Sequence, residues 1–388
     1  MSSASPLFGR LARHLRQREV AGTRRRLALP PAGQIDFASN DYLGLARAPA
    51  LRAALQRAVA DAPRLGSTGA RLLTGNSAPA QDLEADIAAF HGSEAALLFN
   101  SGYAANLGLF SALPRRADVI FYDEASHASV KDGIRASFAT AYSFRHNDVA
   151  DLRRRLDQLT LAADAAVFVA VEALYSMGGD AAPLRELAVA CTAAGAHLLV
   201  DEAHSVGLYG PRGEGLVTAL SLDGQVLARV VTFGKALGGQ GAAVLGPALL
   251  RDYLLNFSRP FIYTTAPPDY ALAPLRAAYA LLPTLGAERA RLLALSAYAH
   301  AQLSGLGAGH LPPDCRVILP LRLPHYSASR VRELAAAVQA AGFDVRAIVP
   351  PTVPPGQQCL RVIVHSFNTE SEIDGLTAVL RRELARGA

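Results

Sequence analysis

The chain has 388 residues, of which 51% are hydrophobic and 18% are charged, and its formal net charge is +5. This composition excludes a disordered protein and predicts a globular one with more than one domain. The basic residues are scattered, and their densest run, Arg24–Arg26, is too short for a nucleic-acid-binding stripe, so we expect no nucleic-acid partner.

The cysteines and the apolar runs indicate the compartment. Cys191, Cys315 and Cys359 lie far apart and have no metal-type spacing, so we expect neither a disulfide framework nor a metal site. No apolar run approaches the roughly 20 residues that span a bilayer, and the polar N-terminus has no apolar signal core. These features predict a cytoplasmic protein without a membrane partner.

The apolar pattern divides the chain into three expected parts. Residues 1–46 form an N-terminal arm, in which Leu7–Val20 has helical spacing and Gln34–Ala38 is a strand candidate. Residues 47–268 form a large domain, and residues 269–388 form a smaller C-terminal domain.

Strand and helix patterns alternate in the large domain. The apolar strand candidates are Ala95–Phe99, Val119–Tyr122, Ala166–Val171, His197–Val200, Arg229–Thr232 and Ala242–Leu245. The helical patterns between them are Asn106–Leu113, Ser129–Ser137, Val149–Leu159 and Pro183–Ala194. Such an alternation is typical of an α/β fold with a mainly parallel sheet that helices cover on both faces.

The smaller domain has a mixed pattern. It opens with a long Ala/Leu-rich helical run and ends with a strand (Val345–Ile348), a proline-rich loop (Pro350–Gly356), a strand (Leu360–Val364) and a helix (Glu370–Leu384). This order predicts an α+β domain.

Two motifs at strand ends carry the strongest chemical signal. Asp201 ends one buried strand candidate, and Lys235 follows another between glycines. Ligands bind at the carboxyl edge of such a sheet, so we expect both side chains in one crevice. Either motif alone is weak, because an acid at a strand end commonly caps a turn and a surface lysine is commonly solvated. Together they are far more specific.

The chemistry of pyridoxal phosphate (PLP) explains this pair. PLP needs a lysine for its imine and an acid that keeps the pyridine nitrogen protonated, because the protonated ring is the better electron sink. A carboxylate on a pyridinium is a charge-assisted hydrogen bond worth about 1.5–3 kcal/mol. Other chemistries are disfavoured, since Ala236 after Lys235 excludes a P-loop lysine and the chain has no H-E-x-x-H or G-x-S-x-G motif.

Three more polar segments follow predicted strands. Asn100–Asn106 opens a helix, and the N–H groups of a helix N-terminus suit a phosphate, although a Ser/Gly helix start is ordinary when taken alone. Asp123–Ser129 contains His127, which is suited to stack on a cofactor ring, although a lone turn histidine is usually structural. Glu172–Asp180 follows a further strand. Five polar clusters at five strand ends can converge on one crevice.

These motifs, in this order, resemble the α-oxoamine synthases, a family of fold-type-I PLP enzymes, over nearly the whole chain. The matching segments are Ser39–Gly44, Gly66–Gly69, Ser101–Tyr103, Ser126–Ser129, Ser176–Asp180, Asp201–His204, Thr232–Lys235 and Pro351–Pro354. The resemblance implies a PLP transferase fold, with a large domain and a smaller α+β domain.

The resemblance also implies how the cofactor is held. Lys235 forms the Schiff base and later moves the substrate proton, Asp201 pairs with the pyridine nitrogen, and His127 stacks on the ring. The remaining implied contacts are Gly102, Tyr103 and Thr232 around the phosphate, Ser176 and His204 near the phenolic oxygen, and Thr264 and Thr265 on the phosphate of the neighbouring subunit. The last pair implies a homodimer.

The implied reaction joins a small amino acid to an acyl thioester, carried by coenzyme A or a carrier protein, with loss of CO2. Arg361 and Asn40 would bind the amino acid and Arg24 the acyl substrate. The segments Gly241–Gly246 and Phe261–Thr265 favour members that use L-alanine and a pimeloyl thioester in biotin biosynthesis, whereas members that use glycine or serine remain alternatives. A catalytically silent relative should lack the lysine, and Lys235 is present.

Ala70 bears on the choice of amino acid. The loop Gly66–Arg71 resembles the segment that lies over the amino-acid side chain in this family, and glycine-specific members carry threonine at this position. Threonine is branched and stiff at χ1, so it would press on the space of a substrate methyl group. Alanine leaves that space open, unless Ala70 is only a small loop residue.

Overall fold

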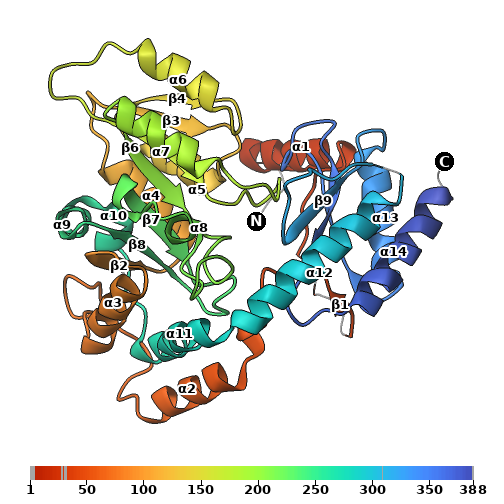
Figure 1. Cartoon of the computed structure of the whole chain (residues 1–388), viewed down its shortest axis with the longest axis horizontal. Helices are drawn as coiled ribbons and strands as arrows, with labels where there is room; N and C mark the ends of the chain where they lie inside the picture. The colour runs from red at the N-terminus through yellow and green to blue at the C-terminus, as the bar shows by residue number, and fades with distance from the viewer. Residues whose placement is uncertain (1–4, 28, 30–32, 308, 387–388) are drawn as a thin grey trace. The chain divides into compact units, whose positions relative to one another are not determined.

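The computed structural model describes residues 5–27, 29, 33–307 and 309–386, and the chain divides into two compact units (Figure 1). The smaller unit comprises Met1–Ser39, Met177–Gly179 and Leu293–Ala388, and the larger unit comprises Asn40–Ser176 and Asp180–Leu292. These units differ from the expected divisions after residues 46 and 268.

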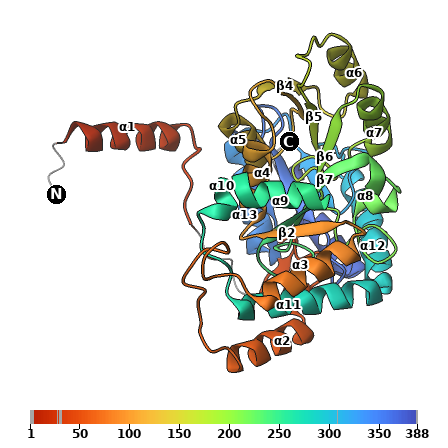
Figure 2. The same cartoon turned by 90° about the vertical axis from the view of Figure 1, so that its left-hand side faces the viewer.

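Long-range pairing explains where the units divide. Strand β1 (Ile35–Asp36) pairs in parallel with β10 (Phe343–Asp344), which joins most of the N-terminal arm to the C-terminal part of the chain. Helix α11 (Asp269–Leu281) packs against α2 (Pro49–Ala60) and α3 (Ala78–Phe90), and it runs beside them in both views (Figures 1 and 2). The periodicity of a helix does not specify which unit its apolar face covers.

The larger unit is built on one sheet. Its strands are β2 (Ala95–Phe99), β3 (Val119–Asp123), β4 (Thr140–Phe144), β5 (Val167–Glu172), β6 (His197–Asp201), β7 (Val226–Thr232) and β8 (Ala242–Gly246). Within the described residues their order is β2-β8-β7-β6-β5-β3-β4; β8 runs antiparallel to both of its neighbours, and the other adjacent strands pair in parallel. The expected mainly parallel α/β sheet is thereby confirmed. The sequence pattern missed β4, because this edge strand is exposed except at Phe144.

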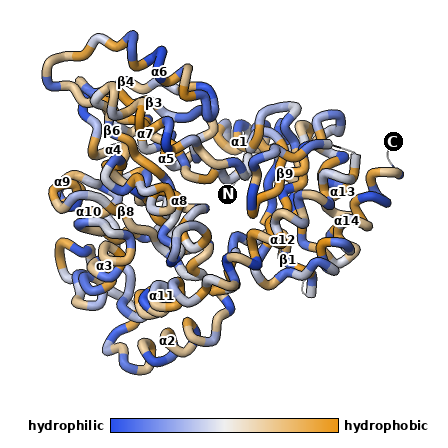
Figure 3. The backbone as a smooth tube through the Cα atoms, in the orientation of Figure 1, coloured by the Kyte–Doolittle hydropathy of each residue, from blue (hydrophilic) through white to orange (hydrophobic). Residues whose placement is uncertain are grey.

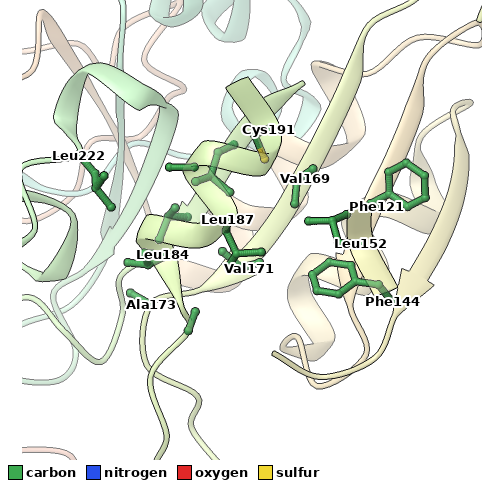
Figure 4. Packing of buried hydrophobic residues seen from close by; sticks show 14 of the residues in the cluster. Phe121, Phe144, Leu152, Val169, Val171, Ala173, Leu184, Leu187, Cys191 and Leu222 are labelled. Carbon is green, nitrogen blue, oxygen red and sulfur yellow. The ribbon is translucent and has the colours of Figure 1, made fainter. Parts of the chain in front are cut away.

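Helices cover both faces of the sheet. Successive residues of a strand point to opposite faces, so each buried strand contributes side chains to both layers of the core. Val169 of β5 packs with Leu152 and Leu187 on one face (Figure 4), and Phe168 packs with Leu109 on the other. The strands of this sheet are coloured largely as hydrophobic in Figure 3. The helices not yet given are η1 (Leu45–Arg47), α4 (Gly102–Ala112), α5 (Ala128–Ala136), α6 (Val149–Asp157), α7 (Leu184–Ala193), α8 (Leu216–Ala219), η2 (Asp223–Gln225), α9 (Ala248–Phe257), α10 (Arg259–Ile262) and η3 (Leu282–Thr284).

The smaller unit has the expected α+β composition. Its further elements are α1 (Pro6–Val20), β9 (Ile318–Arg322), α13 (Ala328–Ala340), β11 (Arg346–Ile348), β12 (Cys359–Ile363) and α14 (Glu370–Ala385), and α12 (Gly286–Ser304) begins in the larger unit and ends in this one. Strand β12 pairs antiparallel with both β11 and β9. In the described parts of the chain, no helix is long and apolar enough to cross a membrane.

Candidate active site

A cavity of about 360 Å³ lies in the larger unit where the parallel strands end. Parallel strands bring their carboxyl ends to one edge of a sheet, so the polar residues that follow β2, β5, β6 and β7 meet there. Eight of the predicted site residues line this cavity: Asn40, Gly102, Tyr103, His127, Asp201, His204, Thr232 and Lys235.

Asp201 is the last residue of β6 and is 7% exposed. Its Oδ1 accepts a hydrogen bond from the backbone N–H of Ala203 at 2.9 Å, and its Oδ2 accepts one from Asn106 Nδ2 at 2.7 Å. Each carboxylate oxygen has two lone pairs, so these two bonds orient the group and leave acceptor capacity on the cavity side.

Lys235 lies in the loop between β7 and β8. Gly238 in this loop has a φ of +65°, and a Cβ atom there would lie 2.1 Å from the backbone nitrogen of Ala46, so only glycine fits. The Lys235 Nζ atom lies 2.8 Å from Nε2 of His204, whose Nδ1 lies 2.6 Å from the Tyr42 hydroxyl. The glycine-lined loop thus places the amine beside a histidine that is only 4% exposed.

The N-terminus of α4 faces the same cavity. Ser101 caps this helix, because its Oγ accepts a hydrogen bond from the Ala104 N–H at 3.1 Å. A Cβ atom on Gly102 would lie 2.5 Å from Cγ2 of Thr232, so a side chain at this position would fill the space between helix and strand end. Backbone N–H groups at such a helix start suit an anion.

His127 and Glu172 also line the cavity. The His127 N–H donates to Oε1 of Glu172 at 2.6 Å, and burial lowers the pKa of His127 against the opposing charge of Asp201. Burial, and then the charge of Asp201, raise the pKa of Glu172 to about 8. Glu172 and Asp201 are paired residues of neighbouring strands, so two carboxyl groups lie side by side at this edge.

Four predicted residues of the larger unit lie outside the cavity lining. Ser176 follows β5, and Thr264 and Thr265 accept hydrogen bonds from Nδ2 of Asn100, at 3.0 Å to Thr264 Oγ1 and 2.9 Å to the Thr265 carbonyl. Ala70 lies in a turn in which its carbonyl accepts from the N–H groups of residues 73 and 75.

Two predicted residues belong to the smaller unit. Arg24 Nη1 pairs with Oε2 of Glu19 at 2.5 Å on the protein surface. Arg361 is 9% exposed and lies on β12, opposite Arg346 in the strand register.

The residues around the cavity fit a PLP cofactor. They combine a lysine amine, a buried carboxylate, two histidines and a helix N-terminus, which are the groups that the aldehyde, the pyridine nitrogen, the ring and the phosphate of PLP require. Among the described residues, no group of three or more His, Cys, Asp or Glu side chains could hold a metal ion. All three cysteines are buried thiols.

Comparison with known proteins agrees with this chemistry. A family model described as aminotransferase class I and II matches residues 32–380. The chain therefore belongs to the aminotransferase class I and II family, and within it to the α-oxoamine synthases, whose cofactor is PLP.

Individual relatives narrow the comparison. The 8-amino-7-oxononanoate synthase of Emericella nidulans is 42% identical in an alignment of length 395, gaps included, which covers 96% of this chain and 94% of that protein. A solved structure of SPT with PLP has a TM-score of 0.89 and 28% identity, and it covers 98% of both chains. A structure of the Francisella tularensis 8-amino-7-oxononanoate synthase has a TM-score of 0.79 and 28% identity, and covers 92% of this chain and 99% of that one.

The sequence pattern missed four residues that contribute to the site. The motifs contain these residues, but the sequence pattern assigns them no role: Tyr42, Asn106, Ser129 and Glu172. The structure joins each of them to a predicted site residue by a hydrogen bond. The available signal was spacing: Asn106 lies one helical turn after Gly102, on the same face of α4.

Proposed function

We propose that this chain is a PLP-dependent acyltransferase that condenses L-alanine with a pimeloyl thioester to form 8-amino-7-oxononanoate in biotin biosynthesis. The observation that carries the proposal is the shared cavity of Lys235 and Asp201, in a chain that is 42% identical to a relative of that name. The reaction forms a bond between the alanine Cα and the acyl carbonyl carbon, and it releases the thiol and CO2.

The cavity residues have distinct tasks in this proposal. Lys235 binds the cofactor covalently, Asp201 keeps the pyridine nitrogen protonated, and His127 packs on the ring. Gly102, Tyr103 and Thr232 hold the phosphate, and Ser176 and His204 bind the phenolic oxygen. When bound, PLP supplies an electron sink for the electron pair that remains on the substrate Cα after its proton leaves.

Lys235 moves the proton in this reaction. Its Nζ atom must be a neutral amine to take the Cα proton. His204 Nε2 lies 2.8 Å away, within hydrogen-bond distance of this amine, and orients it. The pair supports proton transfer at one defined atom.

The substrate contacts follow from charge and shape. The Arg361 guanidinium binds the amino-acid carboxylate with help from Asn40, because a planar fork of N–H donors matches a carboxylate. Arg24 binds the acyl substrate. Ala70 leaves room for the methyl group that distinguishes alanine from glycine.

We also infer a homodimer, in which Thr264 and Thr265 contact the phosphate in the neighbouring subunit. The preceding Tyr263 is 72% exposed, so this segment is available at the surface for a contact with the partner. Mixing Lys235→Ala chains with chains altered at Thr264 and Thr265 should restore one intact site per heterodimer. A monomer in sedimentation that keeps full activity would contradict the dimer.

The second candidate is a sibling enzyme such as serine palmitoyltransferase, glycine C-acetyltransferase or 5-aminolevulinate synthase. The higher TM-score of the SPT structure favours the first of these, but the two solved structures are equally identical to this chain at 28%. The 42% identity to an 8-amino-7-oxononanoate synthase outweighs that likeness.

A thiol-release assay tests the proposal. Alanine, glycine and serine are each combined with short, pimeloyl and long acyl thioesters, on coenzyme A and on a carrier protein, so that the donor is identified at the same time. Alanine with the pimeloyl thioester should give the highest kcat/KM. A preference for serine with a long acyl chain would replace this proposal with the second candidate.

The buried free cysteines support our proposal of a reducing, cytoplasmic location.

A further inference from the structure

Asn106 connects the two walls of the cofactor cavity. It lies on α4, its side chain is among the residues that line the cavity, and it is 2% exposed. Its Nδ2 atom lies 2.7 Å from Oδ2 of Asp201 and 3.0 Å from Oγ of Ser129. The Ser129 Oγ in turn lies 2.7 Å from Nδ1 of His127. Four side chains from three segments (α4, β6 and the start of α5) therefore form one continuous hydrogen-bonded chain.

The chemistry of the groups assigns a direction to every bond. An ionised carboxylate only accepts, so one Asn106 N–H donates to Asp201 and the second donates to Ser129 Oγ. The Ser129 hydroxyl then has its own hydrogen to donate to His127 Nδ1, and the Ser129 backbone N–H, 3.2 Å away, also points to this atom. Nδ1 of His127 is thus an acceptor, and the neutral ring has its proton on Nε2.

The orientation of the Asn106 amide is determined by the same contacts. In the described part of the chain, its buried Oδ1 atom has no hydrogen-bond partner. Exchanging the amide oxygen and nitrogen would place Oδ1 against the Asp201 carboxylate, which is acceptor against acceptor. Both N–H groups of Asn106 Nδ2 therefore donate hydrogen bonds, and this orientation of the amide leaves Oδ1 unpaired.

We propose that Asn106 is a positioning residue of this enzyme, which holds the Asp201 carboxylate and, through Ser129, the His127 ring in fixed orientation in the cofactor cavity. The inference rests on the proposed function, because it assumes that PLP occupies the cavity. A buried carboxylate with a fixed neutral donor stays oriented toward the pyridine nitrogen, and a histidine of fixed tautomer presents an invariant face to the ring.

The test compares cofactor binding and cofactor protonation in variants of the whole enzyme. Asn106→Ala removes both bonds, Asn106→Asp keeps the size but replaces the donor by an acceptor, and Ser129→Ala removes only the branch to His127. PLP affinity is measured by titrating the cofactor-free protein and following the visible circular dichroism of bound PLP. The protonation of the pyridine nitrogen is measured by the NMR shift of 15N-labelled PLP.

Asn106→Ala and Asn106→Asp should weaken PLP binding roughly 10- to 100-fold, the factor that loss of one hydrogen bond to a charged group produces. Both should shift the 15N signal toward the unprotonated ring, whereas Ser129→Ala should leave that signal in place. The matched control is Gln358→Ala, which also removes a buried amide that donates to two groups, the carbonyls of Pro324 and Tyr326. It should leave affinity and signal unchanged.

Two outcomes separate the inference from the function on which it rests. Wild-type protein that neither binds PLP nor releases thiol would refute the proposed function. Wild-type protein that does both, together with Asn106 variants that bind PLP within two-fold of wild type and keep the protonated 15N signal, would overturn the role of Asn106 alone.

Discussion

A buried ion pair behind the cavity offers a quantitative test of the structure. Arg229 on β7 is 5% exposed, and Glu202, which directly follows Asp201, is fully buried. The Arg229 Nε atom lies 2.6 Å from Glu202 Oε2. Glu202 Oε1 also accepts from Ser205 Oγ at 2.8 Å and from the Val217 N–H at 3.0 Å. These contacts hold the turn that carries His204.

Replacing Arg229 by methionine fills most of the volume but leaves the Glu202 charge without a cation. Breaking a buried ion pair in this way costs about 3–5 kcal/mol, because the remaining charge is desolvated and uncompensated. The second pair that Arg229 makes, with the partly exposed Asp223 at 3.1 Å, adds little. We therefore expect Arg229→Met to lower the free energy of unfolding by about 3–5 kcal/mol.

Urea unfolding of the cofactor-free protein, followed by far-UV circular dichroism, measures this loss. The control is Arg276→Met in the same unit, since Arg276 pairs with Asp86 at 2.7 Å but both side chains are nearly half exposed. That variant should lose less than about 1 kcal/mol. Adding Glu202→Gln to Arg229→Met should recover about 2 kcal/mol or more, because the buried charge is gone. Equal losses in the two single variants would refute the reasoning.

Three further predictions concern the site and its surroundings. Lys235→Ala should abolish turnover while the fold is kept, and borohydride should fix the cofactor on Lys235 in the wild type only; turnover near the wild-type rate would refute its role. Ala70→Thr should move the ratio of kcat/KM values toward glycine by roughly ten-fold, the lower range of what a methyl group supplies, and an unchanged ratio would exclude contact with the substrate. Burial opposes the charge of His146, but hydrogen bonds to Asp123 and Asp180 outweigh it and raise the pKa of His146 to about 10. Because the pKa of His146 is raised in the folded state, its charged form stabilises the fold, and His146→Gln should lower the free energy of unfolding most below the unfolded pKa of about 6.5. This loss should vanish as the pH rises through about 10, and denaturation at a series of pH values measures it.

Much of the fold and part of the site follow from local pattern. The apolar runs that predicted β2, β5 and β6 end within a residue or two of the observed strands, because a strand buried on both faces must be apolar throughout. The rule that strand ends share one edge then places Asp201 and Lys235 in one cavity without any knowledge of the topology.

Other features depend on partners that are distant in the chain. The exposed edge strand β4 has no apolar pattern, and the arm joins the smaller unit through long-range contacts such as the pairing of β1 with β10. The bond between Asn106 and Asp201 spans 95 residues of chain, and the pair of Arg229 with Glu202 joins β7 to the residue that follows β6. Local sequence determines which residues are buried and how they repeat. Only the register of the strands and the packing of α4 and α5 decide which two polar atoms come within 3 Å of each other, because a hydrogen bond depends on atomic distance and direction and leaves no periodic trace in the chain.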